Sequence, residues 1–545
     1  MKNFFYSAKN HILSKNDPNS IPYLTLTLLA VVLFVTAPKN GDFWWSEAPR
    51  NALNGAFVLD FIKAMPFSDP VNWAKQYYYQ YPALTILFYP PMLYLFIAAF
   101  YAIFGVSHSS ALACITVFSF FLGLGIYKLA CRMVARPAAL AASLLFFSAP
   151  GIFIWAQQIM LEIPMMTFSV WSAYFLIKYC ENEKWQDLFI CALLIISASY
   201  TKQMAAIIGL SFIVALLLGY GIGIFASRQM QVIAAFSIIA LVPLAFLQVK
   251  FGSFNVVSVV NRPDFQTDRL SFQNIFWYLK QFPSMMGWGL FLFSFLGGIV
   301  GFLNREKLAQ KPDFLIYICW FLMGYLAMTI IHFKEPRHGT FLLIPLTLAA
   351  SLFLDRFLSS PYLRLTPPII AIILLISTII RHPTPRIDGY NKASDLIAEM
   401  APPNAKILFA GNQDGNFIFN IRQHKNRPDI SIIRADKIFL NIAIMPNHGL
   451  NPRDFTYDQV QQTLNQLGIS YVVTVPHIWS ETQPMAYLAQ ILESGMFQQV
   501  CKLAVTGNTA DTELLIYKNL NPLPQNPVGF DMELRGIGVF LKGTQ

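Results

Sequence analysis

Charged side chains are scarce in this sequence. Asp, Glu, Lys and Arg make up 12% of its 545 residues, whereas 55% of the residues are hydrophobic. Soluble globular domains carry about twice that charged fraction, and a soluble chain would have to bury too many apolar runs. The composition therefore excludes a soluble protein and predicts a polytopic α-helical membrane protein.

Cysteine patterns typical of metal or redox sites are missing as well. The six cysteines form no CxxC motif and no Cys/His cluster, which argues against a disulfide framework and against a zinc site. No internal repeat is evident, whereas many transporters consist of repeated halves with ionisable residues near the bilayer midplane. The first apolar segment lacks a small-residue cleavage site followed by a soluble domain, so we expect a retained span.

The positive charge of the chain does not indicate a nucleic-acid partner. The formal net charge is +10, but the Lys and Arg residues are scattered through short connections between apolar segments. Membrane topology and anionic lipid headgroups explain this distribution, because basic residues gather in cytoplasmic loops. Membrane lipids are therefore expected partners, and nucleic acid is not.

Apolar segments of nearly spanning length follow one another along most of the chain. Eleven are expected to cross the membrane: 23–35 with its flanks, 109–129, 137–155, 164–178, 188–200, 204–226, 232–249, 285–303, 314–331, 339–354 and 367–380. A further apolar segment, 82–106, contains Tyr89-Pro90-Pro91. We expect it to re-enter or to lie on the membrane surface, because prolines break helices and leave carbonyls unsatisfied in lipid.

The charges of the connections predict an orientation. Connections 131–136, 178–187, 305–311 and 356–364 are basic, and Arg228 marks another. Placing them in the cytoplasm together with the N-terminus satisfies the positive-inside rule, so the C-terminus lies outside. Every membrane-proximal cluster of acids and cations then falls on the outer face, where one shared site is expected. Loop by loop these residues are Glu47 and Arg50 in the first outer loop (38–108), Glu162, Lys202, Asn261-Arg262-Pro263-Asp264, and Lys334, Arg337 and His338.

From residue 383 to residue 545 the composition becomes that of a soluble domain. Strands are expected at 406–410, 430–433, 469–475 and 514–518, helices at 458–467 and 485–494, and a plain turn at 411–415. This alternation predicts a small extracytoplasmic α/β domain that follows a transmembrane domain of residues 1–382.

Five short motifs carry a family resemblance. They are Trp44-Trp45-Ser46-Glu47-Ala48-Pro49-Arg50, Tyr89-Pro90-Pro91, Met160-Leu161-Glu162-Ile163-Pro164, Thr201-Lys202 and Glu335-Pro336-Arg337-His338. They resemble the motifs of GT-C glycosyltransferases in their order, in their spacing and in lying on the same predicted side of the membrane. The likeness is to the protein-mannosyltransferase (dolichyl-phosphate-mannose-protein mannosyltransferase) and lipid A aminoarabinose-transferase superfamily of bacteria. It covers about residues 22–381 and implies a GT-C fold.

The resemblance also implies an activity. Members of this superfamily take a sugar from a polyprenyl-phosphate-linked donor and pass it to an acceptor on the outer side of the bacterial inner membrane. The acceptor here would be an envelope glycan, a lipid or a protein. Inverting transfer needs a base that deprotonates the acceptor, and Glu47 is the candidate. Glu162 is expected to position the acceptor or to orient a cation.

The leaving lipid phosphate needs cations. Lys202 and Arg337 are the candidates, supported by Arg50 or Lys334; Tyr89 and His338 complete the expected substrate-binding set. Plainer roles stay open for several of these residues: helix capping for Glu47, a dipole contact for Glu162, snorkelling for Lys202, and headgroup contact or a topogenic role for Arg337 and His338.

The sequence departs from the family pattern at its acids. The first loop usually carries an Asp-Glu pair, but here Glu47 stands alone, and the second-loop acid, often Asp, is Glu162. A catalytically inactive relative that acts in assembly therefore stays an alternative, as does a transporter or flippase for a lipid-linked substrate. With only these two acids in place, we expect no metal site, and a divalent cation is not expected to be essential.

Overall fold

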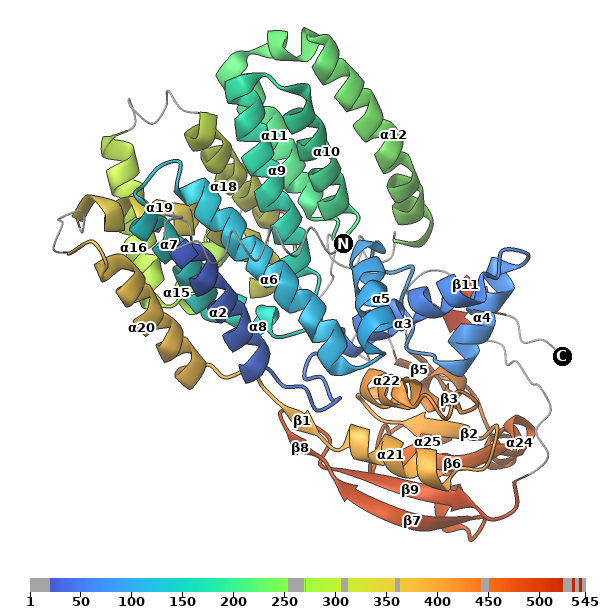
Figure 1. Ribbon diagram of the computed structural model, residues 1–545. Helices are drawn as coiled ribbons and strands as arrows, with labels where there is room; N and C mark the ends of the chain where they lie inside the picture. Colours follow the sequence, from blue (N-terminus) through green and yellow to red (C-terminus); the bar gives the residue numbers. More distant parts are fainter. Residues whose placement is uncertain are drawn as a thin grey trace.

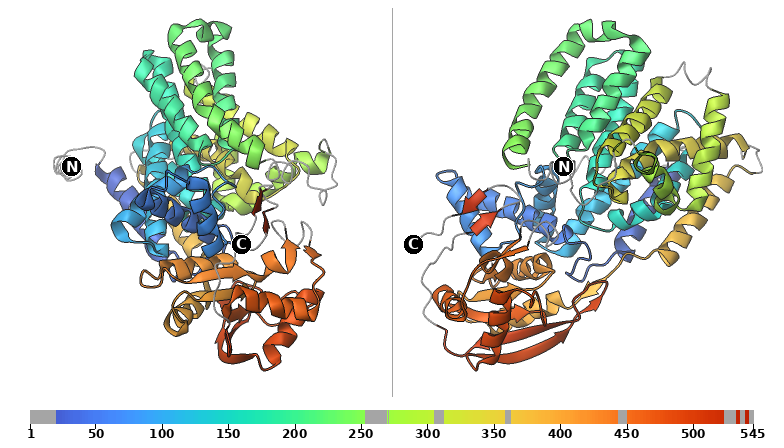
Figure 2. Two further views of the ribbon diagram at one scale, coloured as in Figure 1. Left: turned by 90° about the vertical axis from the view of Figure 1, so that its right-hand side faces the viewer. Right: turned by 180° about the vertical axis from the view of Figure 1, so that it is seen from behind.

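The computed structural model describes residues 20–252, 269, 271–304, 312–357, 363–442, 450–522, 532–534 and 539–541. A bundle of helices forms residues 20–381, and a five-stranded sheet with its own helices follows (Figure 1). The sheet lies at one end of the bundle, as the views from the side and from behind also show (Figure 2). The segment Asn261-Arg262-Pro263-Asp264 lies outside the described residues.

Each apolar segment predicted to span the membrane coincides with a helix. These helices are α2 (Ser20–Thr36), α6 (His108–Ala130), α7 (Arg136–Ser148) with α8 (Pro150–Ala156), α9 (Glu162–Asn182), α10 (Trp185–Ser199), α11 (Ala205–Tyr220), α12 (Arg228–Phe251), α16 (Trp288–Leu303), α18 (Pro312–Ile330), η2 (Pro336–Leu342) with α19 (Leu343–Phe357), and α20 (Thr366–Arg381). The other helices described within residues 20–381 are α3 (Ala48–Ala64), α4 (Pro70–Gln80), α5 (Met92–Phe104), η1 (Ile222–Ala226), α14 (Phe272–Ile275) and α15 (Trp277–Met286).

Helix length limits how many of these elements cross a bilayer unaided. Within the described ranges, four helical stretches are long and apolar enough: His108–Ala130, Arg228–Phe251, Asp313–Ile330 and Pro336–Arg356. The pair α7 and α8 adds a fifth if a bent pair counts as one span. Several shorter apolar helices, α2 and α20 among them, pack beside these stretches. The count of eleven crossings and their orientation stay predictions.

The segment predicted as one span at 137–155 is broken. α7 ends at Ser148, Pro150 opens α8, and the axes of the two helices differ by 76°. Proline has no N–H to donate and its ring clashes with the preceding turn, so the helix ends before it. The bend carries Trp155 away from the line of α7.

The proline-containing segment at 82–106 forms a short helix. α5 has 13 residues, which cover about 20 Å at 1.5 Å per residue, less than the ~30 Å hydrocarbon core of a bilayer. α5 packs closely on α3 and also contacts α6. The close approach requires a glycine, because a Cβ on Gly55 would lie 2.3 Å from Ile97 Cγ2.

The sheet has the order β3-β2-β6-β9-β7. Strands β3, β2 and β6 are parallel to one another. β9 follows beside β6 and is antiparallel to both of its neighbours, β6 and β7. Every residue of β6 is buried, as expected for a strand covered on both faces. The strands are β2 (Lys406–Ala410), β3 (Ser431–Arg434), β6 (Ile469–Thr474), β7 (Phe497–Ala504) and β9 (Glu513–Asn519).

Short strand pairs and five helices complete this part of the chain. The pairs are β1 (Ile387–Asp388) with β8 (Thr506–Gly507), β4 (Leu440–Ile442) with β5 (Leu450–Pro452), and β10 (Met532–Leu534) with β11 (Val539–Leu541). The helices are α21 (Tyr390–Met400), α22 (Asp414–Gln423), α23 (Ala435–Ile438), α24 (Tyr457–Leu467) and α25 (Gln483–Glu493).

Every strand and helix predicted after residue 383 corresponds to an element of the structure. The predicted strands correspond to β2, β3, β6 and β9, and the predicted helices to α24 and α25. The turn predicted at 411–415 is confined to 411–413, because α22 begins at Asp414, and neither Gly411 nor Gly415 has a positive φ. α21, α22 and β7 were not predicted.

Candidate functional site

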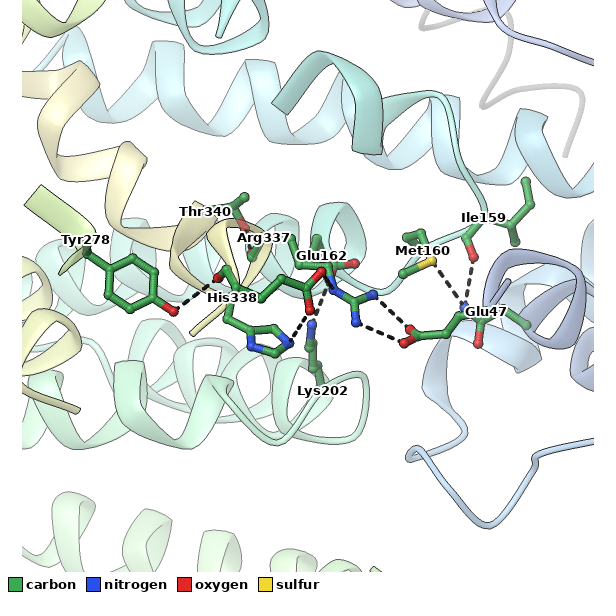
Figure 3. A network of polar contacts seen from close by, with 11 residues as sticks. Glu47, Ile159, Met160, Glu162, Lys202, Tyr278, Arg337, His338 and Thr340 are labelled. Atoms are coloured by element: carbon green, nitrogen blue, oxygen red, sulfur yellow. Dashed lines mark hydrogen bonds and ion pairs between the residues drawn. The ribbon is translucent and has the colours of Figure 1, made fainter. Parts of the chain in front are cut away.

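Acids and cations from four separate segments meet in one place, which we call the ion cluster (Figure 3). Its members are Glu47 at the N-cap of α3, Glu162 at the start of α9, Lys202 in the turn between α10 and α11, Glu335 at the N-cap of η2, and Arg337 within η2. Helix ends leave backbone groups unpaired and are therefore common places for polar sites.

Arg337 is the centre of the ion cluster. Its Nη1 donates to Glu47 Oε2 and its Nη2 to Glu47 Oε1, both at 2.9 Å. Its Nε lies 2.9 Å from Glu335 Oε1 and 4.0 Å from Glu162 Oε1. A paired, two-bond contact of this kind is among the strongest that arginine makes. One guanidinium therefore faces three carboxylates.

Lys202 and Glu162 form the second ion pair of the cluster. Lys202 Nζ donates to Glu162 Oε1 over 2.7 Å, and the two side chains are only 7% and 1% exposed. Glu162 Oε2 is buried and has no hydrogen-bond partner among the described residues. Buried polar atoms are normally paired, so an unpaired oxygen marks a position where a hydrogen-bond donor would be accepted.

Local contacts fix Glu47 relative to Glu162. Pro49 lies in the first turn of α3, where proline favours a helix start. One turn on, Asn51 Nδ2 donates to the carbonyl of Ile159 at 2.9 Å, and Asn51 Oδ1 accepts from Tyr94 at 3.1 Å. α3 is thereby tied to the segment just before α9.

Two tryptophans lie beside the guanidinium of Arg337. Its Cζ is 5.0 Å from the ring centre of Trp45 and 5.9 Å from that of Trp155. Contacts of this kind stabilise a cation electrostatically. The bend between α7 and α8 is what brings Trp155 to this position.

Tyr89 and His338 lie next to the ion cluster. Burial and the nearby Glu47 carboxylate raise the pKa of Tyr89 well above its usual value, so its hydroxyl remains a hydrogen-bond donor. His338 Nε2 is 3.7 Å from Glu335 Oε2, and its ring meets Phe333 edge-on.

Arg50 and Lys334 are held elsewhere. Arg50 Nη2 pairs with Asp414 Oδ1 at 2.9 Å, and the opposite oxygen of Asp414 pairs with Arg434 at 2.8 Å. Lys334 Nζ donates to the carbonyls of Met328 and, at 3.0 Å, Thr329, and burial lowers the pKa of Lys334 to about 8. Neither side chain reaches the ion cluster, so the geometry does not support their expected role on the phosphate.

The α/β part of the chain forms hydrogen bonds with the loop that carries Glu47. Asp42 accepts hydrogen bonds from the backbone N–H groups of Gly389, Tyr390 and Asn391 at 2.9 to 3.0 Å, which caps α21. A fourth bond comes from Asn420 at 2.8 Å. Carboxylates at helix N-termini are favourable because the N–H groups and the helix dipole both attract them.

A second set of contacts joins α22 to α3. Arg422 and Asp60 form a paired contact, with Arg422 Nε 3.0 Å from Asp60 Oδ2 and Nη2 2.7 Å from Oδ1. Gly415 allows the close approach, because a Cβ there would lie 2.9 Å from Pro49 Cγ. Ion pairs therefore hold α3 near both of its ends, at Arg50 and at Asp60.

Sequence reasoning found most of the cluster and missed parts of it. Glu335 was recognised within its motif but received no role, although an acid two residues before a candidate arginine was a usable signal. Trp155 had no signal, because its position depends on the bend at Pro150. Asp414 had none either, since its partner Arg50 is 364 residues away. Among the described residues, no group of three or more His, Cys, Asp or Glu is arranged to hold a metal ion; the dispensability of a divalent cation stays a prediction.

Comparisons with known proteins give a family match over part of the chain and shared folds along most of it. Residues 89–246 match the family described as dolichyl-phosphate-mannose-protein mannosyltransferase. The chain is similar to ArnT from Cupriavidus metallidurans bound to undecaprenyl phosphate, with a TM-score of 0.58 and 15% identity over 92% of this chain and 99% of that one. It is also similar to the oligosaccharyltransferase of Archaeoglobus fulgidus in the apo form, with a TM-score of 0.55 and 12% identity over 92% of this chain and 76% of that one.

A third similar structure is the archaeal oligosaccharyltransferase AglB from Archaeoglobus fulgidus in complex with an inhibitory peptide and a dolichol-phosphate. Its TM-score is 0.50, with 13% identity over 86% of this chain and 70% of that one. A search of curated proteins gives no match. The family match covers residues 89–246, and the chain shares its fold with ArnT and with the archaeal oligosaccharyltransferase along most of its length.

Proposed function

We propose that the chain transfers a sugar, with inversion, from a polyprenyl-phosphate-linked donor to an acceptor at the outer face of a bacterial inner membrane. The observation that carries this proposal is the ion cluster, in which a first-loop carboxylate lies against a buried guanidinium and an ammonium lies beside them. A base next to fixed cations is what this reaction needs. Residues 1–382 would form the transmembrane domain and residues 383–545 an extracytoplasmic domain that covers the site.

The chemical step assigns a role to each residue. Glu47 takes the proton from the acceptor hydroxyl or amine, whose lone pair attacks the anomeric carbon of the sugar. The bond from that carbon to the phosphate oxygen breaks, and the electron pair leaves with the lipid phosphate. Arg337 and Lys202 stabilise the charge that develops on the phosphate, while Glu162 keeps Lys202 in place.

The contacts of Arg337 impose an order on these events. Each terminal nitrogen of Arg337 donates one N–H to Glu47, so a donor phosphate that takes the same paired geometry displaces the Glu47 carboxylate. That exchange frees Glu47 to act as a base. The charges of the cluster support this exchange. The cluster has three carboxylates and two cations, so it accommodates a phosphate more readily when one carboxylate moves away.

Relatives support the choice of donor. One similar structure is bound to undecaprenyl phosphate and another to a dolichol-phosphate, and both compounds are polyprenyl-type lipid phosphates. The matching family is described by a dolichyl-phosphate-mannose donor. The sugar, the acceptor class (envelope glycan, lipid or protein) and the number of phosphates on the carrier are separate questions.

Release of bare polyprenyl phosphate tests the proposal without knowledge of the acceptor. The purified protein in proteoliposomes is mixed with polyprenyl phosphates that carry different sugars and with an envelope extract, and bare polyprenyl phosphate is measured by mass spectrometry. We expect release by the native chain and none by Glu47→Gln. Asp429→Asn is the matched control, because Asp429 also forms a paired contact with an arginine, Arg427, but lies outside the cluster and is not one of the anchors of α3.

The same assay separates the two alternatives. A flippase would move the labelled lipid between leaflets without releasing bare polyprenyl phosphate. An inactive relative would do neither and would give equal, background release in native and Glu47→Gln chains. Either result would overturn the proposed activity.

A further inference from the structure

The ion cluster opens onto a cavity that no step above uses. The cavity has a volume of about 230 Å³ and lies between the segment before α3, helix α8, helix α15 and η2. Trp45, Trp155 and Met285 contribute apolar walls, and Glu335 and Arg337 contribute polar groups. We infer that this cavity is the pocket for a sugar ring, and that it takes a neutral sugar in preference to an acidic one. The inference rests on the proposed function, because it names the substrate class of the same site.

The walls of the cavity suit a sugar ring. The rings of Trp45 and Trp155 are 5.3 Å apart and nearly perpendicular, at 81°, so they form two flat surfaces that meet at a corner. Aromatic faces carry partial negative charge, and they pack favourably against the C–H groups on the face of a pyranose or furanose ring. Mostly apolar walls with a few placed polar groups are typical of small-molecule pockets.

The polar groups suit hydroxyl groups. Glu335 Oε1 is paired with Arg337 Nε, but Glu335 Oε2 is 3.7 Å from His338 Nε2, beyond normal hydrogen-bond length. A carboxylate oxygen accepts more than one hydrogen bond, so Glu335 has acceptor capacity left for sugar hydroxyls. A neutral ring offers such donors directly.

The position of the cavity also fits the donor. A phosphate bound by Arg337 is one bond away from the anomeric carbon of its sugar. Because Arg337 lines the cavity as well as the ion cluster, a donor held by its phosphate places the sugar ring in or at the mouth of the cavity. The tryptophan walls then set the orientation of the ring toward Glu47.

Charge sets the preference among sugars. The carboxylate of Glu335 lines the cavity, and Glu47 and Glu162 lie within the same cluster. A sugar carboxylate placed here would face like charges in a poorly solvated space, which is unfavourable. Neutral sugars avoid this repulsion.

The test compares lipid carriers with and without a sugar. Binding to the full-length protein in nanodiscs is measured for undecaprenyl phosphate, for the same lipid carrying mannose or glucose, and for the lipid carrying glucuronic acid. Trp155→Ala removes a wall, and Ile154→Trp fills the cavity from a lining position. Trp185→Ala is the matched control, because Trp185 is half exposed at the start of α10 and does not line the cavity.

We expect both cavity variants to weaken binding of the hexose-bearing lipids by about tenfold, since an aromatic contact plus its buried area contributes roughly that much. In Ile154→Trp, which keeps both tryptophans beside Arg337, binding of bare undecaprenyl phosphate should change by less than about twofold on the same scale. The native chain should bind the glucuronyl lipid more weakly than the hexosyl lipids, and Glu335→Gln should reduce that difference.

Three outcomes would contradict the inference. Equal weakening of bare and hexose-bearing lipids would show that the cavity variants act on the phosphate site. No weakening of either would show that the sugar lies elsewhere, and equal binding of glucuronyl and hexosyl lipids would remove the charge preference. Failure of the native chain to bind even bare undecaprenyl phosphate would instead count against the proposed function, so the two failures are distinguishable.

Discussion

Removing the charge of Glu47 should tighten the binding of a polyprenyl phosphate, although it abolishes transfer. In the proposed reaction the phosphate competes with Glu47, which accepts a hydrogen bond from each of the two terminal nitrogens of Arg337. Glu47→Gln keeps the size of the side chain and leaves at most one hydrogen bond to the guanidinium. The phosphate then no longer has to displace a carboxylate.

The size of the effect follows from the contact that is lost. Hydrogen bonds to charged groups contribute about 1.5–3 kcal/mol. The Glu47 side chain is 25% exposed, whereas that of Arg337 is 6% exposed, so solvent screening places the loss near the lower end. About 1.4 kcal/mol is a factor of ten in affinity. We therefore expect the dissociation constant of undecaprenyl phosphate to fall by about tenfold in Glu47→Gln.

The assay is a binding titration of undecaprenyl phosphate into native, Glu47→Gln and Asp429→Asn proteins in nanodiscs. Asp429→Asn breaks a paired contact of similar geometry with Arg427 and should leave the affinity unchanged. Affinity that is unchanged or weaker in Glu47→Gln would refute the exchange of Glu47 for phosphate. A gain of the same size in Asp429→Asn would show that the effect is not specific to the ion cluster.

Two further predictions concern the supports of the site. Lys202→Ala leaves Glu162 buried without its ammonium partner, and breaking a buried ion pair costs about 3–5 kcal/mol, so thermal unfolding should occur at a clearly lower temperature. Lys202→Met combined with Glu162→Gln should recover stability but not lipid binding. Equal thermal stability of Lys202→Ala and the native chain would contradict the proposed role of the ion pair. Asp414→Asn weakens the ion pair with Arg50, which lies three residues from Glu47. The value of kcat should therefore fall by about tenfold with little change in KM. Asp395→Asn, at an exposed position of α21, should not change kcat.

The helices that coincide with predicted spans were predictable because each lies within one continuous stretch of apolar residues. The length of a hydrophobic run is local information, and all the predicted segments are helical. The 76° break at Pro150 was not anticipated, since prolines near a helix end are compatible with either a start or a kink. This break decides where Trp155 lies, so the aromatic wall could not be predicted either.

The ion cluster was predictable in part for a different reason. Acids and cations at the ends of apolar segments are costly unless they find partners, and the charge of the connections predicted that they share one side. Which acid meets which cation depends on packing between segments distant in sequence. Arg50 illustrates this limit, because it pairs with Asp414 across 364 residues instead of joining Arg337. The sequence of α22 gave no sign of that contact.

Identification of the lipids that co-purify with the protein is the first experiment to make, because it tests whether the ion cluster binds a polyprenyl phosphate. Native and Arg337→Ala proteins are purified in lipid, and their bound lipids are identified by mass spectrometry; Lys202→Ala serves as a second variant. The account predicts a polyprenyl phosphate or its glycosylated form with the native chain and its loss in both variants. Bulk phospholipid alone in all three, or a polyprenyl phosphate retained equally in all three, would contradict the assignment of the ion cluster as the phosphate site.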